Sequence, residues 1–362
     1  GWFGARSNDS AGLGDWVPRT EAFPQGIRPL ADDVRALGMR FGLWVEPEMV
    51  NPDSDLYRAH PDWVLHYPGR PRSECRNQLI LDFGRPEVVD HILEVLDRLV
   101  REIGVDLFKW DMNRYATEPG SVAGRAVWRA HVHGLYRIMD TLRARHPGLD
   151  IQSCSGGGGR VDLGILSRCD QAWTSDNTDA ITRTRIQDGF SLAYPPRAME
   201  CWVTDETNYL TKRTSSLDLR FDVAMRGVLG IGTPLTALAA EELGEYRSHI
   251  AFYKTIRPVV QNGDLYRLGT AAESGASLWL IVAPDRRTAV FSLVTVDDAV
   301  GRPRGPFLLR GLDPALSYRL TDRHGTESVR FSGAQLMTLG LPDQRRKFGT
   351  SSRSYTLLLE AG

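Results

Sequence analysis

An apolar strand runs directly into a polar cluster in the segment VDLFKWDMNR, residues 105–114. A buried strand that ends in charged and amide side chains is typical of the floor of an active site. The same pattern recurs in DIQSC, residues 150–154, just before a run of four glycines, and in QAWTS, residues 171–175, just before Asp176. Three such strand ends predict one pocket to which several strands contribute.

Strands and amphipathic helices alternate over residues 42–203, which predicts a parallel sheet or a barrel. One helix is predicted to open at Pro86, and a second covers about residues 126–145. The chain therefore belongs to the α/β class, and the expected architecture is a TIM-type (β/α)8 barrel. Two of its eight strands would lie before Gly1. The six predicted strands are residues 41–46, 78–82, 105–111, 150–155, 171–176 and 198–204.

The character of the sequence changes near residue 263. Short apolar strands follow, separated by Gly, Pro, Asp and Arg, and they predict a small antiparallel β domain. We therefore predict an N-terminally truncated catalytic (β/α) barrel over residues 1–262 and a C-terminal antiparallel β-sandwich over residues 263–362. The segment LGIGTP, residues 229–234, is interpreted as a turn and is assigned no chemistry.

The composition is that of an ordinary folded protein, with 42% hydrophobic and 25% charged residues among 362. The 44 basic and 45 acidic residues give a formal net charge of -1. No basic run interleaved with aromatic residues is present, so there is no electrostatic reason to expect nucleic acid or a membrane as a partner. A small or neutral ligand is favoured, and a homo-oligomer is left open for a full-length protein.

The four cysteines show no CxxC and no tight framework spacing, so reduced thiols and a cytoplasmic location are expected. No run of about 18 apolar residues predicts a membrane helix. The chain starts at Gly1 without Met, so it need not include the natural start.

No metal site and no cofactor are expected. His131 and His133 lie two positions apart on a predicted helix and therefore point to different faces. The remaining histidines are scattered singly, and no GxSxG motif anchors a Ser-His-Asp triad.

Asp111 and Asp176 each end a predicted strand, and one strand and two helices lie between them. In a barrel both carboxylates would face one pocket, which suits glycoside hydrolysis: one acid attacks or stabilises the anomeric carbon and the other protonates the leaving oxygen. Lys109 and Arg114 favour an ionised nucleophile at Asp111, whereas Trp173 would partly desolvate Asp176 and keep it protonated. A helix N-cap or a buried ion pair is the alternative for either aspartate alone.

Further residues could line such a pocket. The glycine run at 156–159 lets the backbone approach a sugar, and a phosphate cradle or a plain turn is the alternative. Trp44 offers an aromatic face to a sugar ring, or packs in the core. Arg76 would grip hydroxyls or orient a carboxylate, or lie on the surface. Glu46 and Glu48 are assigned structural hydrogen bonds or ion pairs at the rim.

With these residues in hand, the chain resembles glycoside hydrolase family 36, the retaining α-galactosidases. The resemblance implies that Asp111 is the nucleophile and Asp176 the acid/base in hydrolysis of terminal α-linked galactose from oligosaccharides of the melibiose and raffinose type. It implies no metal or organic cofactor. The segments that carry it are GWFGARSND, GLGDW, FGLWVEPEMV, SDLYRAHPDWVL, RNQLILD, KWDMNR, CSGGGGR, WTSDNTDA and IAFYKTIRPVVQNGDLYRL.

The resemblance also implies which residues line the galactose pocket. Cys154 and Gly156 would lie near the 2-hydroxyl, where little room for an N-acetyl group favours galactose over N-acetylgalactosamine. The implied pocket residues are Trp44, Arg76, Lys109, Asn113, Cys154 and Gly156.

Two departures from the family pattern are visible. Family members carry an Asp-Asp pair immediately before Gly-Trp-Phe-Gly, and this chain starts one residue too late to include it. The N-terminal β-sandwich and the first two barrel strands are missing too, which implies a fragment. The segment MECWV, residues 199–203, stands where many relatives have Met-Gly-Ala/Ser-His-Val, which bears on rim contacts and aglycone preference.

Two alternatives to hydrolysis stay open from the sequence. One is a transferase, similar to the raffinose- and stachyose-forming relatives, that uses the same two acids but passes galactose to a sugar. The other is a non-catalytic, sugar-binding remnant.

Overall fold

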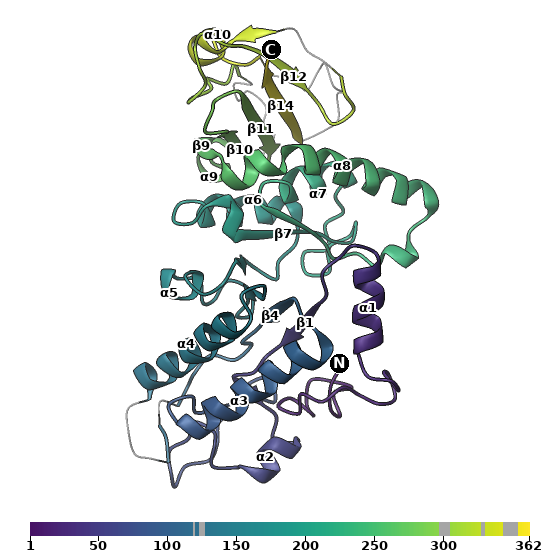
Figure 1. The fold of residues 1–362 in the computed structure, drawn as a ribbon. Helices are drawn as coiled ribbons and strands as arrows, with labels where there is room; N and C mark the ends of the chain where they lie inside the picture. The colour runs from purple at the N-terminus through teal and green to yellow at the C-terminus, as the bar shows by residue number, and fades with distance from the viewer. Residues whose placement is uncertain (119, 123–126, 297–304, 327–329, 343–353) are drawn as a thin grey trace. The chain divides into compact units, whose positions relative to one another are not determined.

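The computed structural model describes residues 1–118, 120–122, 127–296, 305–326, 330–342 and 354–362 (Figure 1). The chain forms two compact units, Gly1–Trp173 and Thr174–Gly362, and each is described by itself. The domain boundary predicted between residues 262 and 263 comes from sequence pattern rather than compactness, and it stays a prediction.

The first unit contains a parallel sheet in which four strands pair in the order β1, β4, β5, β6. Val45, Trp110 and Ser153 are in register, so the carboxyl ends of the first three strands meet at one edge of the sheet. The residues that follow these ends are therefore brought together. The strands are β1 (Gly42–Val45), β4 (Leu107–Trp110), β5 (Asp150–Ser153) and β6 (Gln171–Trp173).

Two long helices of the first unit pack side by side (Figure 1). Helix α3 (Pro86–Arg98) has proline in its first turn, continues as a π-helical turn over Leu99–Ile103, and ends at Gly104 in a left-handed conformation. Helix α4 (Trp128–Arg145) buries Leu135, Ile138, Met139 and Leu142 along one stripe. Both predicted helices are confirmed. The shorter helices are α1 (Arg28–Ala36), α2 (Asp55–Ala59) and α5 (Leu163–Leu166).

The predicted barrel strand over residues 78–82 is wrong. The structure has a two-residue strand here, β3 (Leu79–Ile80), which pairs antiparallel with β2 (Met49–Val50). Both strands are buried on both faces. A short, buried antiparallel pair has the same apolar composition as a barrel strand, so the sequence pattern did not separate the two.

The second unit contains two parallel strands, β7 (Met199–Val203) and β8 (Val228–Ile231). The interpretation of residues 229–234 as a turn is therefore wrong for its first three residues. Gly230 reads as a turn residue, but a Cβ at this position would lie 2.4 Å from the Trp202 ring on the neighbouring strand. The indole needs the space that glycine leaves.

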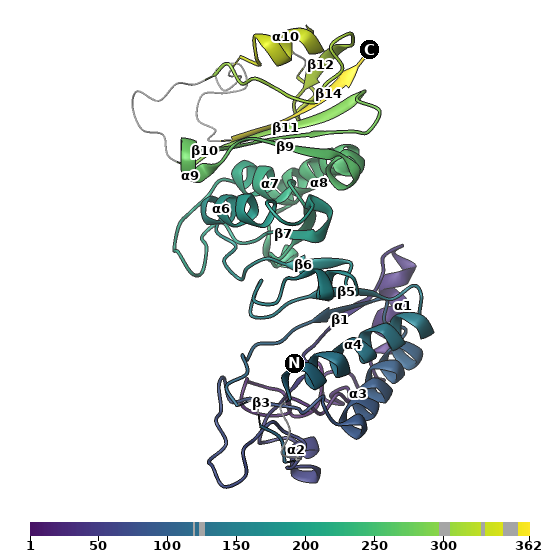
Figure 2. The ribbon, with the colours of Figure 1, turned by 90° about the vertical axis from the view of Figure 1, so that its left-hand side faces the viewer.

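The C-terminal part of the second unit contains an antiparallel sheet, as predicted for this part of the chain. Helices α6 (Ala180–Phe190), α7 (Leu217–Ala224) and α8 (Ala240–Asn262) pack against this sheet (Figure 2). Short helices α9 (Ala271–Ser274) and α10 (Gly333–Thr338) connect its strands. The strand order is β13 (Phe331–Ser332), β12 (Ser317–Thr321), β14 (Ser354–Ala361), β11 (Thr288–Thr295), β10 (Ala276–Val282) and β9 (Asp264–Gly269).

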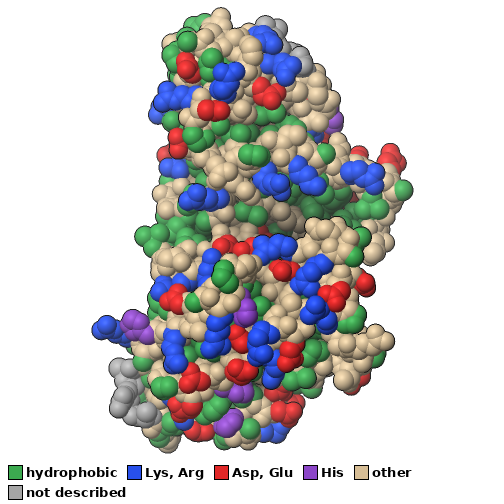
Figure 3. Space-filling view, viewed as in Figure 1, with side chains coloured by type: hydrophobic (Ala, Val, Ile, Leu, Met, Phe, Trp, Pro, Cys, Tyr) green, Lys and Arg blue, Asp and Glu red, His purple; other side chains and the backbone are tan. Residues whose placement is uncertain are grey.

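Within the described residues, six strands have a parallel partner. They are β1, β4, β5 and β6 in the first unit, and β7 and β8 in the second. The predicted number of barrel strands is thus confirmed, although one predicted strand is replaced by β8. None of the helices in the described ranges combines the length and the apolar character that a membrane crossing requires. On the face drawn in Figure 3, basic and acidic side chains are intermixed.

Candidate active site

Asp111 directly follows β4, and its side chain is buried, with 7% of the residue exposed. Its Oδ2 accepts hydrogen bonds from Trp44 Nε1 (3.0 Å) and Asn113 Nδ2 (2.7 Å), and its Oδ1 accepts one from the Met112 main-chain N–H (2.8 Å). Its own N–H donates to the Val45 carbonyl (2.8 Å). Three donors therefore fix the orientation of this carboxyl group, as a positioned reactive group requires.

Trp44 is held in place by other aromatic residues. Its ring stacks near Phe3, with centroids 6.2 Å apart, and lies 6.3 Å from Trp16. Trp2 Nε1 donates to the Trp44 carbonyl (2.9 Å). Trp44 remains half-buried, so its ring both packs against this cluster and keeps exposed surface beside Asp111. The two alternative roles, platform and core packing, thus do not exclude each other.

Arg76 and Asn113 extend the hydrogen-bond network outward from Asp111. Arg76 Nη1 donates to Asn113 Oδ1 (2.9 Å), and Asn113 in turn donates to Asp111. Arg76 and Asn77 both have positive φ angles, 55° and 59°. Consecutive left-handed residues other than glycine are uncommon and cost energy, and such strain gathers at functional sites. Asn51 stabilises this turn by donating to the Asn77 carbonyl (2.6 Å).

Three further residues lie at the carboxyl ends of β4 and β5. They are Cys154, Gly156 and Lys109. Burial and the nearby Asp111 raise the pKa of the Cys154 thiol to about 12, so Cys154 is a small neutral group rather than a nucleophile. Gly156 has a φ of 52°, and a Cβ added there would approach Asn113 Oδ1 at 3.9 Å. Lys109 Nζ donates to Gln152 Oε1 and lies 4.8 Å from the Trp173 ring centroid. The glycine loop and Asn113 are thus neighbours.

Two buried glutamates on the segment after β1 support this network in different ways. Glu46 Oε1 accepts from the Asn113 N–H (2.5 Å), and its Oε2 accepts from Gln78 Nε2 (3.0 Å). These are the structural hydrogen bonds that the sequence suggested. Burial, with a smaller effect of Asp111, raises the pKa of Glu46 to about 7.

Glu48 has cationic partners instead. Its Oε1 accepts from Arg160 Nη1 (2.6 Å) and Trp110 Nε1 (3.0 Å), and its Oε2 lies 3.5 Å from His131 Nε2. Burial alone would raise the pKa of Glu48, but Arg160 and His131 outweigh it and hold the pKa at about 2. This ion pair is buried in the protein and does not lie at the rim, so that part of the interpretation is wrong.

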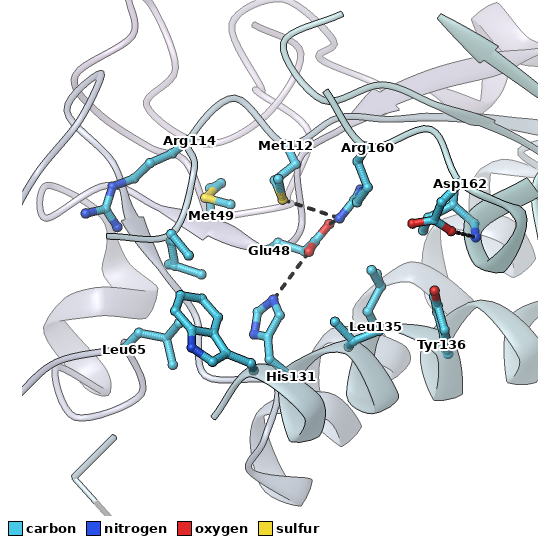
Figure 4. Close-up of a pocket in the computed structure, with 15 residues that line it drawn as sticks. Glu48, Met49, Leu65, Met112, Arg114, His131, Leu135, Tyr136, Arg160 and Asp162 are labelled. Atoms are coloured by element: carbon cyan, nitrogen blue, oxygen red, sulfur yellow. Dashed lines mark hydrogen bonds and ion pairs between the residues drawn. The ribbon is translucent and has the colours of Figure 1, made fainter. Parts of the chain in front are cut away.

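Arg160 directly follows the glycine run, so its bond to Glu48 ties the glycine loop to the strand segment after β1 (Figure 4). The same residues line a cavity of ≈220 Å³, which α4 closes on one side with His131, Leu135 and Tyr136. This cavity is mainly apolar, and Asp111 is not among its lining residues. Met112, the residue after Asp111, does line it.

Within the described ranges, no group of three or more His, Cys, Asp or Glu side chains could hold a metal ion. His131 Nδ1 accepts from the Phe83 N–H (3.3 Å), so the ring proton is on Nε2 and faces Glu48. His131 therefore serves the ion pair.

Glu46 gives the first prediction. A folded-state pKa of about 7, against 4.5 when unfolded, means that stability is present below pH 4.5 and is lost as pH rises through 7. The difference corresponds to about 3 kcal/mol at alkaline pH. Glu46→Gln, which carries no charge, should be less sensitive to pH, and urea unfolding at pH 5 and pH 8 measures this. An unchanged difference between the two pH values would contradict the prediction.

Asp176 lies in the second unit, in the loop after β6, and is exposed. Buried Arg183 of α6 holds this loop by donating to Thr174 Oγ1 and to the Ser175 carbonyl (3.1 Å). Asp179 caps the start of α6 by accepting from the Thr182 N–H (2.8 Å). The loop that carries Asp176 is thus fixed at both ends.

Seven of the eight residues expected at the site lie in the first unit, and the structure brings them to one edge of the parallel sheet. The eighth, Asp176, belongs to the other unit, so its pairing with Asp111 and its desolvation by Trp173 stay predictions. The expectation for Arg114 is wrong, because it donates to Ser73 Oγ (3.0 Å) and Thr117 Oγ1 (3.1 Å) rather than accompanying Asp111.

Several supporting residues had not been assigned a role from the sequence. Gln78 and Gln152 are the partners of Glu46 and Lys109, and Arg183 holds the loop of Asp176. These three side chains are buried, but glutamine and arginine usually lie at the surface, so the sequence does not mark them as partners. Arg160 could have been noticed, because it directly follows the glycine run.

Parallel strands with helices between them, and a fixed carboxylate among polar side chains at the strand ends, form an arrangement that barrel glycoside hydrolases use. A family model described as Melibiase matches residues 1–263, and one described as the glycosyl hydrolase family 36 C-terminal domain matches residues 276–357. The chain belongs to glycosyl hydrolase family 36.

The chain is similar to curated and solved α-galactosidases. α-Galactosidase AgaA of Geobacillus stearothermophilus is 43% identical over 93% of this chain and 47% of its own length. α-Galactosidase C of Emericella nidulans is 40% identical over 99% of this chain and 48% of its own length. The crystal structure of AgaA superposes with a TM-score of 0.94 at 41% identity, over 100% of this chain and 50% of that one. The chain spans about half the length of these relatives.

The comparison confirms the predicted fold class, a (β/α) barrel followed by an antiparallel β domain. Variants of AgaA have been solved in complex with raffinose and with stachyose, and those structures also cover all of this chain.

Proposed function

We propose that the protein is an α-galactosidase that removes terminal α-linked galactose from oligosaccharides of the melibiose and raffinose type, with retention of configuration. The observation that carries this proposal is the Asp111 carboxyl, buried and fixed by three N–H donors at the carboxyl end of β4. Support comes from relatives described as α-galactosidases and from the raffinose and stachyose complexes of AgaA.

In the proposed mechanism the Asp111 carboxylate attacks the anomeric carbon and forms a galactosyl ester, while Asp176 donates a proton to the leaving oxygen. Asp176 then removes a proton from water, and the water releases galactose from Asp111. Trp44 and Asn113 hold the attacking carboxylate in one orientation, because their N–H groups both donate to the same oxygen, Oδ2.

The remaining pocket residues would bind the galactose hydroxyls. Arg76, which donates to Asn113, and Lys109, which donates to Gln152, would supply the N–H donors, and Cys154 and Gly156 add little bulk at the same strand ends. Donors that meet a sugar at fixed positions give it one orientation, and a pocket with a few polar groups is typical of small-molecule sites. No metal or organic cofactor is needed for this chemistry.

Asp176 gives the second prediction and the test of the proposed mechanism. Proton donation contributes about 10²- to 10⁴-fold to the rate. This contribution is larger for a poor leaving group than for a good one. Asp176→Ala should therefore lose far more activity on raffinose than on 4-nitrophenyl α-galactoside, whose phenolate leaves without a proton. The measurement is kcat/KM on both substrates.

Asp179→Ala is the control, since Asp179 caps the next helix. It should reduce activity on both substrates in the same proportion, through the position of the loop. Equal losses on the two substrates for Asp176→Ala would remove this residue from the role of proton donor.

A further inference from the structure

A loop of the second unit, residues 205–214, lies against the loop that carries Asp176. Its side chains reach the segment between Asp176 and the start of α6, where Asp179 is buried. Several hydrogen bonds of this kind hold the loop in one position relative to the loop that carries Asp176. The bonds are Asn208 Nδ2 to Thr178 Oγ1 (3.0 Å), Thr211 Oγ1 to Asp179 Oδ2 (3.0 Å), and Arg213 Nη1 to Asp179 Oδ1.

Tyr209 lies at the exposed part of this loop, directly beside Asp176. Its hydroxyl donates to the main-chain carbonyl of Asp176 (3.2 Å), which fixes the distance between the ring and the acidic residue. The ring itself is not packed into the protein, because 59% of Tyr209 is exposed. Leu210, its neighbour, is exposed to a similar extent, 52%.

The position of Asp176 in the reaction decides what Tyr209 can contact. Under the proposed function, on which this inference rests, Asp176 gives its proton to the oxygen between galactose and the leaving group. It must therefore stand on the side of the leaving group, and a ring bonded to its main chain stands on that side too. An aromatic ring with one polar tip offers an apolar face to the C–H groups of a sugar while its hydroxyl stays hydrogen-bonded.

We propose that Tyr209 determines specificity for the leaving group: its ring is the surface on which the first hexopyranose beyond the galactose rests. Asn208, which is buried, and Arg213 hold the loop so that the ring keeps its place beside Asp176. The ring adds binding energy only for substrates that carry a sugar as leaving group. A substrate with a methyl group there gains nothing from it.

The test compares raffinose with methyl α-galactoside in the protein that carries this chain. Tyr209→Ala should lower the ratio of kcat/KM for raffinose over that for methyl α-galactoside by about tenfold, the size expected for the loss of one apolar contact with a substrate. Tyr209→Phe, which keeps the ring and gives up the hydroxyl, should keep most of this ratio. Leu210→Ala is the matched control, because it removes a neighbouring exposed side chain, and its ratio should equal that of the parent protein.

Three results would overturn the inference. They are an equal loss on both substrates in Tyr209→Ala, a fall of the ratio in Tyr209→Phe as large as in Tyr209→Ala, and a fall of the ratio in Leu210→Ala as large as in Tyr209→Ala. A parent protein that hydrolyses methyl α-galactoside but responds in one of these ways leaves the proposed function intact. A parent protein that hydrolyses neither substrate refutes the proposed function, and the inference falls with it.

Discussion

Asp111→Asn should lower kcat/KM on every α-galactoside by about 10⁴-fold or more, the scale of loss seen when a nucleophile is removed. The amide cannot form the galactosyl ester. The carboxylate accepts hydrogen bonds on both oxygens, from Trp44, Asn113 and Met112. An amide has one oxygen and one NH₂ group, so its NH₂ group would face at least one of these N–H donors. The loss of kcat/KM in Asp111→Asn should be nearly the same for substrates with good and with poor leaving groups. The loss expected for Asp176→Ala differs between them.

The matched control lies at the opposite end of the same strand. Asp106 accepts from the Phe41 N–H (2.9 Å) and from Arg35 (3.1 Å), far from the carboxyl ends of the strands. Asp106→Asn should lower the midpoint of urea unfolding with little change in kcat/KM. If Asp111→Asn retained more than about one hundredth of the parent activity, a nucleophilic role for Asp111 would not be tenable.

Arg160→Ala should destabilise the protein by about 3 to 5 kcal/mol, because it leaves Glu48 charged and buried without its main partner. The comparison is with Arg137→Ala, which removes an ion pair of nearly the same length, 2.7 Å to Asp90, from the exposed face of α4. That exposed pair should contribute less than about 1 kcal/mol. Urea unfolding of both variants at neutral pH measures the difference.

The effect of pH adds a second readout to this prediction. The pKa of Glu48 is lowered from 4.5 to about 2, so its contribution to stability is present above pH 4.5 and is lost as pH falls through 2. The parent protein should lose stability over this range, and Arg160→Ala should lose less. Equal stability of Arg160→Ala and Arg137→Ala would show that the buried pair is not what holds the glycine loop to the strand segment.

The strand ends were predictable because their signal is local. Each of the segments 105–114, 150–154 and 171–175 changes from apolar to polar within a few residues, and parallel strands bring such ends to one edge. The errors arose where the deciding contact is distant in the sequence. Gly230 in β8 leaves the space that the Trp202 indole of β7, 28 positions earlier, occupies, and neither residue alone reveals this.

The opposite behaviour of Glu46 and Glu48 also depends on distant contacts. The two residues are separated by one proline and are equally buried, yet the pKa of one is raised and that of the other is lowered. The difference comes from Arg160, 112 positions further along the chain, and from His131, both of which meet Glu48. The residue types of the site could be predicted, whereas their protonation required the partners.

The central claim is that Asp111 forms the covalent bond to galactose. The most direct measurement is to treat the protein with 5-fluoro-α-galactosyl fluoride, which slows release of the galactosyl enzyme, and to locate the adduct by peptide mass spectrometry. The account predicts one fluorogalactosyl group, bound as an ester to Asp111. An adduct on any other residue, or first-formed β-galactose from methyl α-galactoside with no adduct at all, would contradict it.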